Sequence, residues 1–182
     1  MKRAILFPGI GYHKDKPLLY YSMRLAKEAG YEITCVDYSG IPWEKGDLGD
    51  PGRMKELFAE AMEKVYSTVD EAAFREGDEI LFISKSIGTV VAACYAAEKK
   101  IKAKQIYYSP VVSFGTYAQE GGIAFYGDAD PLADAGEIEK ICGSRKIEKY
   151  RIEGGNHSLE TGDTQADLQK LQDIMKRVKS YI

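Results

Sequence analysis

Three residues have the types that acyl-transfer chemistry needs, and they stand far apart in the sequence. They are Ser86, Asp130 and His157, the last being one of only two histidines. A serine hydroxyl becomes nucleophilic at neutral pH when a base takes its proton, and a carboxylate can hold that base in the productive tautomer. We therefore examine Ser86 as nucleophile, His157 as base and Asp130 as the orienting acid.

The serine lies where an apolar run passes directly into a small-residue helical pattern. Residues 83–89 read ISKSIGT, the strand-turn-helix context that a nucleophile elbow requires. Such a turn needs small side chains two residues on either side of the nucleophile; Gly88 fits, and Ser84 stands where glycine is usual. The following helix N-terminus favours negative charge, and the Ile87 N–H can point at an oxyanion. The alternative is that Ser84 or Ser86 only caps the helix.

The acid and the base each follow a predicted strand. Asp130 is our choice of carboxylate and Asp128 the reserve, although Gly-Asp and Asp-Pro are also ordinary turn signals. A calcium loop is excluded there, because the spacing lacks the required glycine and terminal glutamate. His157 follows two glycines after the last predicted strand. The order serine, aspartate, histidine is that of α/β-hydrolase triads.

Short apolar runs alternate with longer amphipathic stretches along the whole chain. This alternation predicts a parallel sheet with helices on both faces, an α/β fold in three layers with about six mostly parallel strands. Ligands of such sheets bind at the carboxyl ends of the strands, where all three candidate residues fall. We expect a loop over 41–52, strands over 4–7, 31–36, 79–84, 104–108, 122–126 and 146–152, and helices over 17–29, 53–75, 86–98, 133–142 and 164–181.

Composition narrows the class of protein. The 182 residues suit a single domain spanning 1–182, with 45% apolar and 29% charged residues. A formal charge of −3 and a pI near 5.5 do not indicate a basic surface for binding nucleic acid. The three cysteines are widely spaced, which favours reduced thiols over disulfides. The first apolar run stops at Pro8, which is too early for the apolar segment of a signal peptide. We expect a cytoplasmic protein without membrane or nucleic-acid partners.

These motifs together resemble the α/β-hydrolase superfamily, in particular its small members without a cap domain. The resemblance covers nearly the whole chain and rests on FPGIG at 7–11, SKSIG at 84–88, GDADP at 127–131 and GNHS at 155–158. It implies that the loop after the first strand supplies a second oxyanion-hole N–H, here from Ile10 or alternatively Gly11. It also implies a minimal sheet and chemistry that needs no metal or organic cofactor.

The sequence also predicts what borders the site. Only residues 110–121 separate two predicted strands where larger members insert a cap, so we expect an open site without a lid. Tyr12, Trp43 and Val111, with Gly11, are the expected substrate-binding residues. His13 is interpreted as a surface residue, and Lys85 is an unusual neighbour for a nucleophile that we expect to point to solvent.

The leading hypothesis is therefore a serine hydrolase that cleaves an ester or thioester of a small acyl substrate through an acyl-enzyme, acting as a monomer or homodimer. A non-catalytic binding protein on the same fold is the second hypothesis. A peptidase or an acyltransferase on the same scaffold is the third, because a fold does not fix the reaction.

Overall fold

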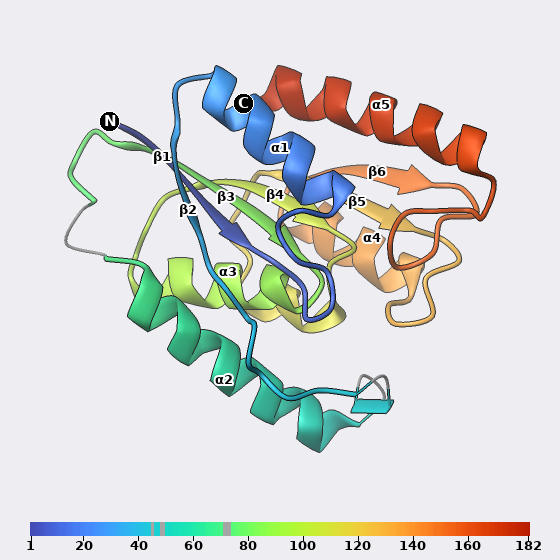
Figure 1. Cartoon of the computed structure of the whole chain (residues 1–182), viewed down its shortest axis with the longest axis horizontal. Helices are drawn as coiled ribbons and strands as arrows, with labels where there is room; N and C mark the ends of the chain where they lie inside the picture. Colours follow the sequence, from blue (N-terminus) through green and yellow to red (C-terminus); the bar gives the residue numbers. More distant parts are fainter. Residues whose placement is uncertain (45, 48–49, 71–73) are drawn as a thin grey trace.

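The computed structural model describes residues 1–44, 46–47, 50–70 and 74–182, and in these residues a parallel sheet lies between two layers of helices (Figure 1). The strand order is β2-β1-β3-β4-β5-β6, and every neighbouring pair is parallel. The strands are β1 (Lys2–Phe7), β2 (Glu32–Cys35), β3 (Glu79–Lys85), β4 (Lys104–Tyr108), β5 (Ile123–Gly127) and β6 (Glu148–Ile152). The helices are α1 (Pro17–Glu28), α2 (Pro51–Thr68), α3 (Ile87–Glu98), the 3-10 helix η3 (Val112–Thr116), α4 (Ala135–Ser144) and α5 (Thr164–Tyr181).

The central strands are apolar on both faces because both faces are covered. Alternate residues of a strand point to opposite sides of the sheet, and the core accordingly divides into two clusters. Phe7 and Phe82 join the cluster beneath α2, α3 and α4, whereas Leu6 and Ile83 join the cluster beneath α1 and α5 (Figure 1). This arrangement confirms the predicted α/β class and the parallel sheet.

One predicted helix has the wrong ends. We expect a helix over 53–75, but α2 begins at Pro51. Asp50 caps this start, because its carboxylate accepts hydrogen bonds from Gly52 N and Arg53 N. It ends at Thr68 because Val69 adopts an extended conformation and buries its side chain in the core. The predicted stretch 71–73 lies outside the described residues. In the described part of the chain, no helix has the length and hydropathy of a membrane span.

The end of β1 and the start of α3 approach each other as closely as two backbones can. A Cβ placed on Gly88 would lie 2.2 Å from the Phe7 carbonyl oxygen and 2.3 Å from that of Pro8. Real Cβ atoms do not come so near to backbone oxygens, so only glycine fits at position 88. The requirement for a small residue after the predicted elbow therefore has a direct steric cause.

Substituting Gly88→Ala is expected to destabilise the fold by ~3 kcal/mol or more, because either β1 or α3 must move. Gly143→Ala is the matched control, since Gly143 lies in α4 with no atom within 4 Å of an added Cβ. That variant is expected to equal or slightly exceed the wild type in stability. Chemical denaturation of both measures the difference, and equal unfolding free energies would contradict the close-approach argument.

Candidate active site

Ser86 occupies a strained turn between β3 and α3. Its φ of 56° and ψ of −127° lie in a region that residues other than glycine rarely adopt, at a cost of about 1–3 kcal/mol. The neighbouring strand holds it there, because Ser86 N donates to the Tyr108 carbonyl at 3.0 Å. On the helix side, the Ser86 carbonyl accepts from the N–H of Thr89 at 2.9 Å and from its hydroxyl at 2.6 Å. The turn lifts the Ser86 side chain above the carboxyl end of the sheet.

The three candidate side chains form one hydrogen-bonded line. The distance from His157 Nε2 to Ser86 Oγ is 2.7 Å, and the distance from His157 Nδ1 to Asp130 Oδ2 is also 2.7 Å. The other Asp130 oxygen accepts from Leu132 N at 2.9 Å, and only 2% of the Asp130 side chain is exposed. The structure thus brings together the serine, base and acid expected from the sequence.

Neither serine of the elbow segment caps α3. Ser86 stands at the N-cap position, yet its side chain makes no capping hydrogen bond and its hydroxyl lies against His157 instead. Ser84, fully buried, donates to the Ile106 carbonyl at 3.0 Å. Serine in place of the usual glycine is therefore accommodated inside the sheet by one hydrogen bond to the neighbouring strand.

Two glycines bring the acid and base loops together. A Cβ on Gly127 would lie 1.9 Å from the Gly155 carbonyl oxygen, so the segments after β5 and β6 touch backbone to backbone. The Ala129 N–H donates to that same carbonyl at 3.0 Å. The reserve carboxylate, Asp128, is used elsewhere: it accepts from Gly154 N at 2.6 Å and pairs with Arg151. Asp128 therefore secures the loop, and Asp130 alone of the two meets His157.

Burial lowers the pKa of His157 below its usual value near 6.5. The hydrogen bond to Asp130 opposes this effect, and the positive charge of Lys85 adds to it. The imidazole is therefore largely neutral at neutral pH. A neutral ring is the form that can accept a proton.

The loop after β1 lies directly against the nucleophile. Gly9 and Tyr12 exchange two backbone hydrogen bonds of 3.1 Å around a two-residue turn of Ile10 and Gly11. A Cβ on Gly9 would lie 3.2 Å from the Ser86 Cβ, so this turn borders the serine. The two hydrogen bonds within the turn are donated by the Gly9 and Tyr12 amides, not by the Ile10 amide. Ile87 is the first residue of α3, where backbone N–H groups have no acceptor within the helix.

A pocket of about 480 Å³ opens beside Ser86. Its wall comes from the start of α2, the start of α3 and the segment around η3, and it is lined by Pro51, Met54, Lys55, Phe58, Ser86, Ile87, Val90, Val111, Ser113, Thr116, Tyr117 and Leu132. Val111 is thus next to the serine, as expected. The contribution of α2 was not foreseen, because no sequence pattern tells where a helix outside the sheet places its first turn.

The other expected substrate residues lie elsewhere. Gly11 and Trp43 line a second hollow of about 500 Å³, together with Ile10 and His13. The Trp43 ring packs on Gly11, where an added Cβ would come within 2.5 Å of it. Tyr12 lines neither hollow; its hydroxyl accepts from Leu18 N at 3.2 Å.

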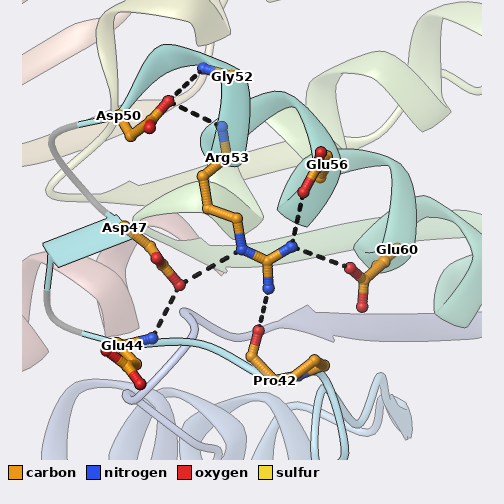
Figure 2. Close-up of polar contacts among 8 residues, drawn as sticks. All are labelled: Pro42, Glu44, Asp47, Asp50, Gly52, Arg53, Glu56 and Glu60. Atoms are coloured by element: carbon orange, nitrogen blue, oxygen red, sulfur yellow. Dashed lines mark hydrogen bonds and ion pairs between the residues drawn. The ribbon is translucent and has the colours of Figure 1, made fainter.

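Arg53 ties the Trp43 segment to α2 (Figure 2). Its guanidinium donates to the Pro42 carbonyl and contacts the Asp47 carboxylate at 3.4 Å. Within α2 it also reaches Glu56 at 2.9 Å and Glu60 at 3.5 Å. One side chain thereby joins the segment that carries Trp43 to the helix that lines the pocket beside Ser86.

The expectation that Lys85 points to solvent is wrong. Its side chain is 0% exposed, and its Nζ donates to the His157 carbonyl at 2.7 Å. Strand periodicity contained the signal, because position 85 continues the face of Leu81 and Ile83, which is buried beneath α1 and α5. His13, by contrast, has 64% of its side chain exposed, in keeping with a surface residue.

Nothing in the described residues suggests a metal centre, since no three of their His, Cys, Asp or Glu side chains converge on a point where an ion could bind. The cysteines Cys35, Cys94 and Cys142 are free thiols.

Comparison with known proteins gives matches by structure only. No family model matches the sequence, and no curated protein does. Est1E from Butyrivibrio proteoclasticus with ferulic acid bound superposes with a TM-score of 0.73 at 13% identity, covering 100% of this chain and 88% of that one. XC6422 from Xanthomonas campestris, an α/β serine hydrolase without lid, gives 0.64 at 18% identity, covering 99% and 80%. An α/β serine hydrolase homologue from Coxiella burnetii gives 0.61 at 17%, covering 97% and 84%.

All three structures superpose over nearly the whole of this chain. At such low identity they establish the fold alone, and the chain has an α/β-hydrolase fold.

Proposed function

We propose that the chain is a serine hydrolase that cleaves an ester or thioester of a small acyl substrate through an acyl-enzyme. The observation that carries the proposal is the hydrogen-bonded line from Asp130 through His157 to Ser86, built on a strained turn. A non-catalytic protein would have no need to keep a costly backbone conformation aimed at a half-buried histidine.

In the proposed mechanism the Nδ1–H of His157 donates to Asp130, which leaves Nε2 free to accept the Ser86 proton. The Ser86 oxygen attacks the substrate carbonyl, and the Ile87 and Ile10 N–H groups stabilise the oxyanion. His157 then gives its proton to the leaving group, and the acyl group remains on Ser86. A water that transfers a proton to His157 attacks the acyl-enzyme carbonyl. The bond from the acyl carbon to Ser86 Oγ then breaks, the acid is released, and His157 returns the proton to the serine oxygen.

The pocket beside Ser86 supports an apolar substrate group. Most of its lining is aliphatic or aromatic, and a volume of about 480 Å³ is of the size that holds a small organic molecule. Est1E, the structural neighbour with bound ferulic acid, adds aryl esters to those worth assaying. A panel of short acyl, aryl and thioester substrates, with peptides and alcohol acceptors, ranks hydrolysis against the peptidase and acyltransferase alternatives.

Substituting Ser86→Ala is expected to abolish labelling by a fluorophosphonate probe and to lower ester hydrolysis by roughly 10⁴-fold or more, since the nucleophile is lost. Ser84→Ala is the matched control two residues away, because Ser84 Oγ donates to the Ile106 carbonyl of the neighbouring strand. That variant should still label. A folded wild-type protein that neither labels nor hydrolyses p-nitrophenyl esters would refute the proposal.

Substituting Asp130→Asn is expected to lower kcat by roughly 10⁴-fold, because an amide no longer fixes the required histidine tautomer. Asp128→Asn is the control: it removes the neighbouring carboxylate, which contacts Arg151 and Gly154 and not His157. Its kcat should stay within a few-fold of the wild type. Steady-state kinetics on one ester decide the matter, and similar losses in both variants would argue against the assigned acid.

The pH profile should follow the protonation of His157. Burial depresses the pKa of this group, so the neutral, active form persists below pH 6.5. The value of kcat/KM is therefore expected to be constant near neutral pH and to fall on acidification, with a midpoint below 6.5. A midpoint above 6.5 in the free enzyme would contradict the assigned environment of the base.

A further inference from the structure

Lys85 is a buried lysine that ends β3, immediately before Ser86. Its side chain has no exposed surface, and removing an ammonium group from water is costly unless polar partners replace the water. The Nζ atom donates to the His157 carbonyl oxygen at 2.7 Å and lies 5.1 Å from the centre of the Tyr12 ring. These partners belong to the two segments on either side of the nucleophile.

The His157 carbonyl has a second donor. Ser109, the residue after β4, directs its hydroxyl to the same oxygen at 2.8 Å. The backbone of His157 is therefore held from two neighbouring strands, while its ring joins Asp130 and Ser86. Both hydrogen bonds fix the point from which the imidazole extends.

On its other side Lys85 contacts the turn that borders the oxyanion position. Tyr12 closes the two-residue turn that contains Ile10, and its own hydroxyl is anchored by Leu18 N. The Lys85 ammonium lies over the face of this ring, where a cation is attracted by the aromatic π electrons. One side chain therefore connects the base's backbone to the proposed oxyanion turn.

Charged and titratable groups face Lys85 from three segments: Asp130 after β5, His157 after β6 and Tyr12 after β1. Burial, with a contribution from Glu160, raises the pKa of Tyr12 to about 12, so this phenol stays neutral. Beyond it, burial also raises the pKa of Tyr108, which stays neutral. Asp130 and His157 are thus the groups whose charges interact with that of Lys85.

Burial lowers the pKa of Lys85 to about 7, with the Asp130 carboxylate opposing the change. The lysine is accordingly charged through the acidic range in which His157 titrates. Its positive charge lowers the pKa of His157, because two adjacent cations repel. Above neutrality the amine loses its charge but still carries N–H groups that can donate to the carbonyl.

We propose that Lys85 is a positioning residue of the active site, which fixes the His157 backbone and places a positive charge close to the imidazole. This role rests on the proposed hydrolase function for its meaning. The contacts and the charge coupling that it requires exist independently of turnover, so they can be measured separately.

Nuclear magnetic resonance of the histidine rings tests the charge coupling directly. The chain has only two histidines, so the His13→Gln background leaves His157 as the single signal. In that background Lys85→Met should shift the His157 titration to higher pH, because a repelling charge is gone. Ser109→Ala, which removes the other donor to the same carbonyl but no charge, should leave the midpoint in place.

Kinetics at pH 8, where His157 is neutral in every variant, test the positioning. Lys85→Met is expected to lower kcat by roughly 10–100-fold, in line with the cost of a misplaced catalytic group. Ser109→Ala should give a smaller loss of kcat. Little change in KM is expected for either, because neither side chain lines the pocket beside Ser86.

An unchanged His157 midpoint in folded Lys85→Met would overturn the proposal. If that variant does not fold, Lys85→Gln and the wild type give the answer: the glutamine variant should shift the midpoint in the same direction, and one ¹³C-labelled lysine of the wild type should titrate near neutral pH. A Lys85 amine that is already neutral in the acidic range in which His157 titrates would equally overturn the charge coupling. A wild type that hydrolyses no ester while its midpoint still responds to Lys85 would refute the hydrolase and uphold the coupling.

Discussion

The site depends on one backbone conformation, the left-handed turn at Ser86. A serine at φ 56° costs about 1–3 kcal/mol, and no interaction of the side chain alone could hold it there. The conformation persists because β3 and α3 are both fixed by the core, and because Gly88 lets α3 begin against the backbone of Phe7 and Pro8. The packing of the sheet and α3 therefore maintains the unfavourable conformation of Ser86.

A second contact of the same kind, between Gly127 and Gly155, sets the geometry of the acid and the base. Neighbouring parallel strands end at the same edge, so the segments after β5 and β6 begin about one strand spacing apart. The absence of a side chain at Gly127 lets the Gly155 carbonyl close the remaining gap. Asp130 and His157 then meet without any long side chain spanning the distance. The close approaches between backbone segments therefore set the positions from which the side chains of the site extend.

Much of this could be predicted from the sequence because it follows from local rules. Ser86, Asp130 and His157 were found by their positions after predicted strands, and the α/β class by the alternation of apolar runs. The environment of Lys85 was missed because a lysine in a turn usually reaches water, and only the tertiary partners of a strand end reveal burial. Strand alternation beyond Ile83 was the overlooked signal.

The sequence could not predict which residues line the pocket beside Ser86 or where Trp43 lies. The pocket beside Ser86 depends on how the first turns of α2 pack, and the place of Trp43 depends on the contacts of Arg53 with Pro42 and Asp47 (Figure 2). These are distant in sequence from the elbow and follow no periodic pattern.

The two parts of the site also differ in how they are stabilised. Ser86, His157 and Lys85 are held by hydrogen bonds to backbone atoms of the sheet and its loops, whereas Arg53 joins the Trp43 segment to α2 through one hydrogen bond to Pro42 and one partly exposed ion pair with Asp47, which is worth at most about 1 kcal/mol. We therefore expect loss of the Arg53–Asp47 pair to cost little stability. A fold built this way can change the lining of the pocket while the arrangement of Ser86, His157 and Asp130 stays the same.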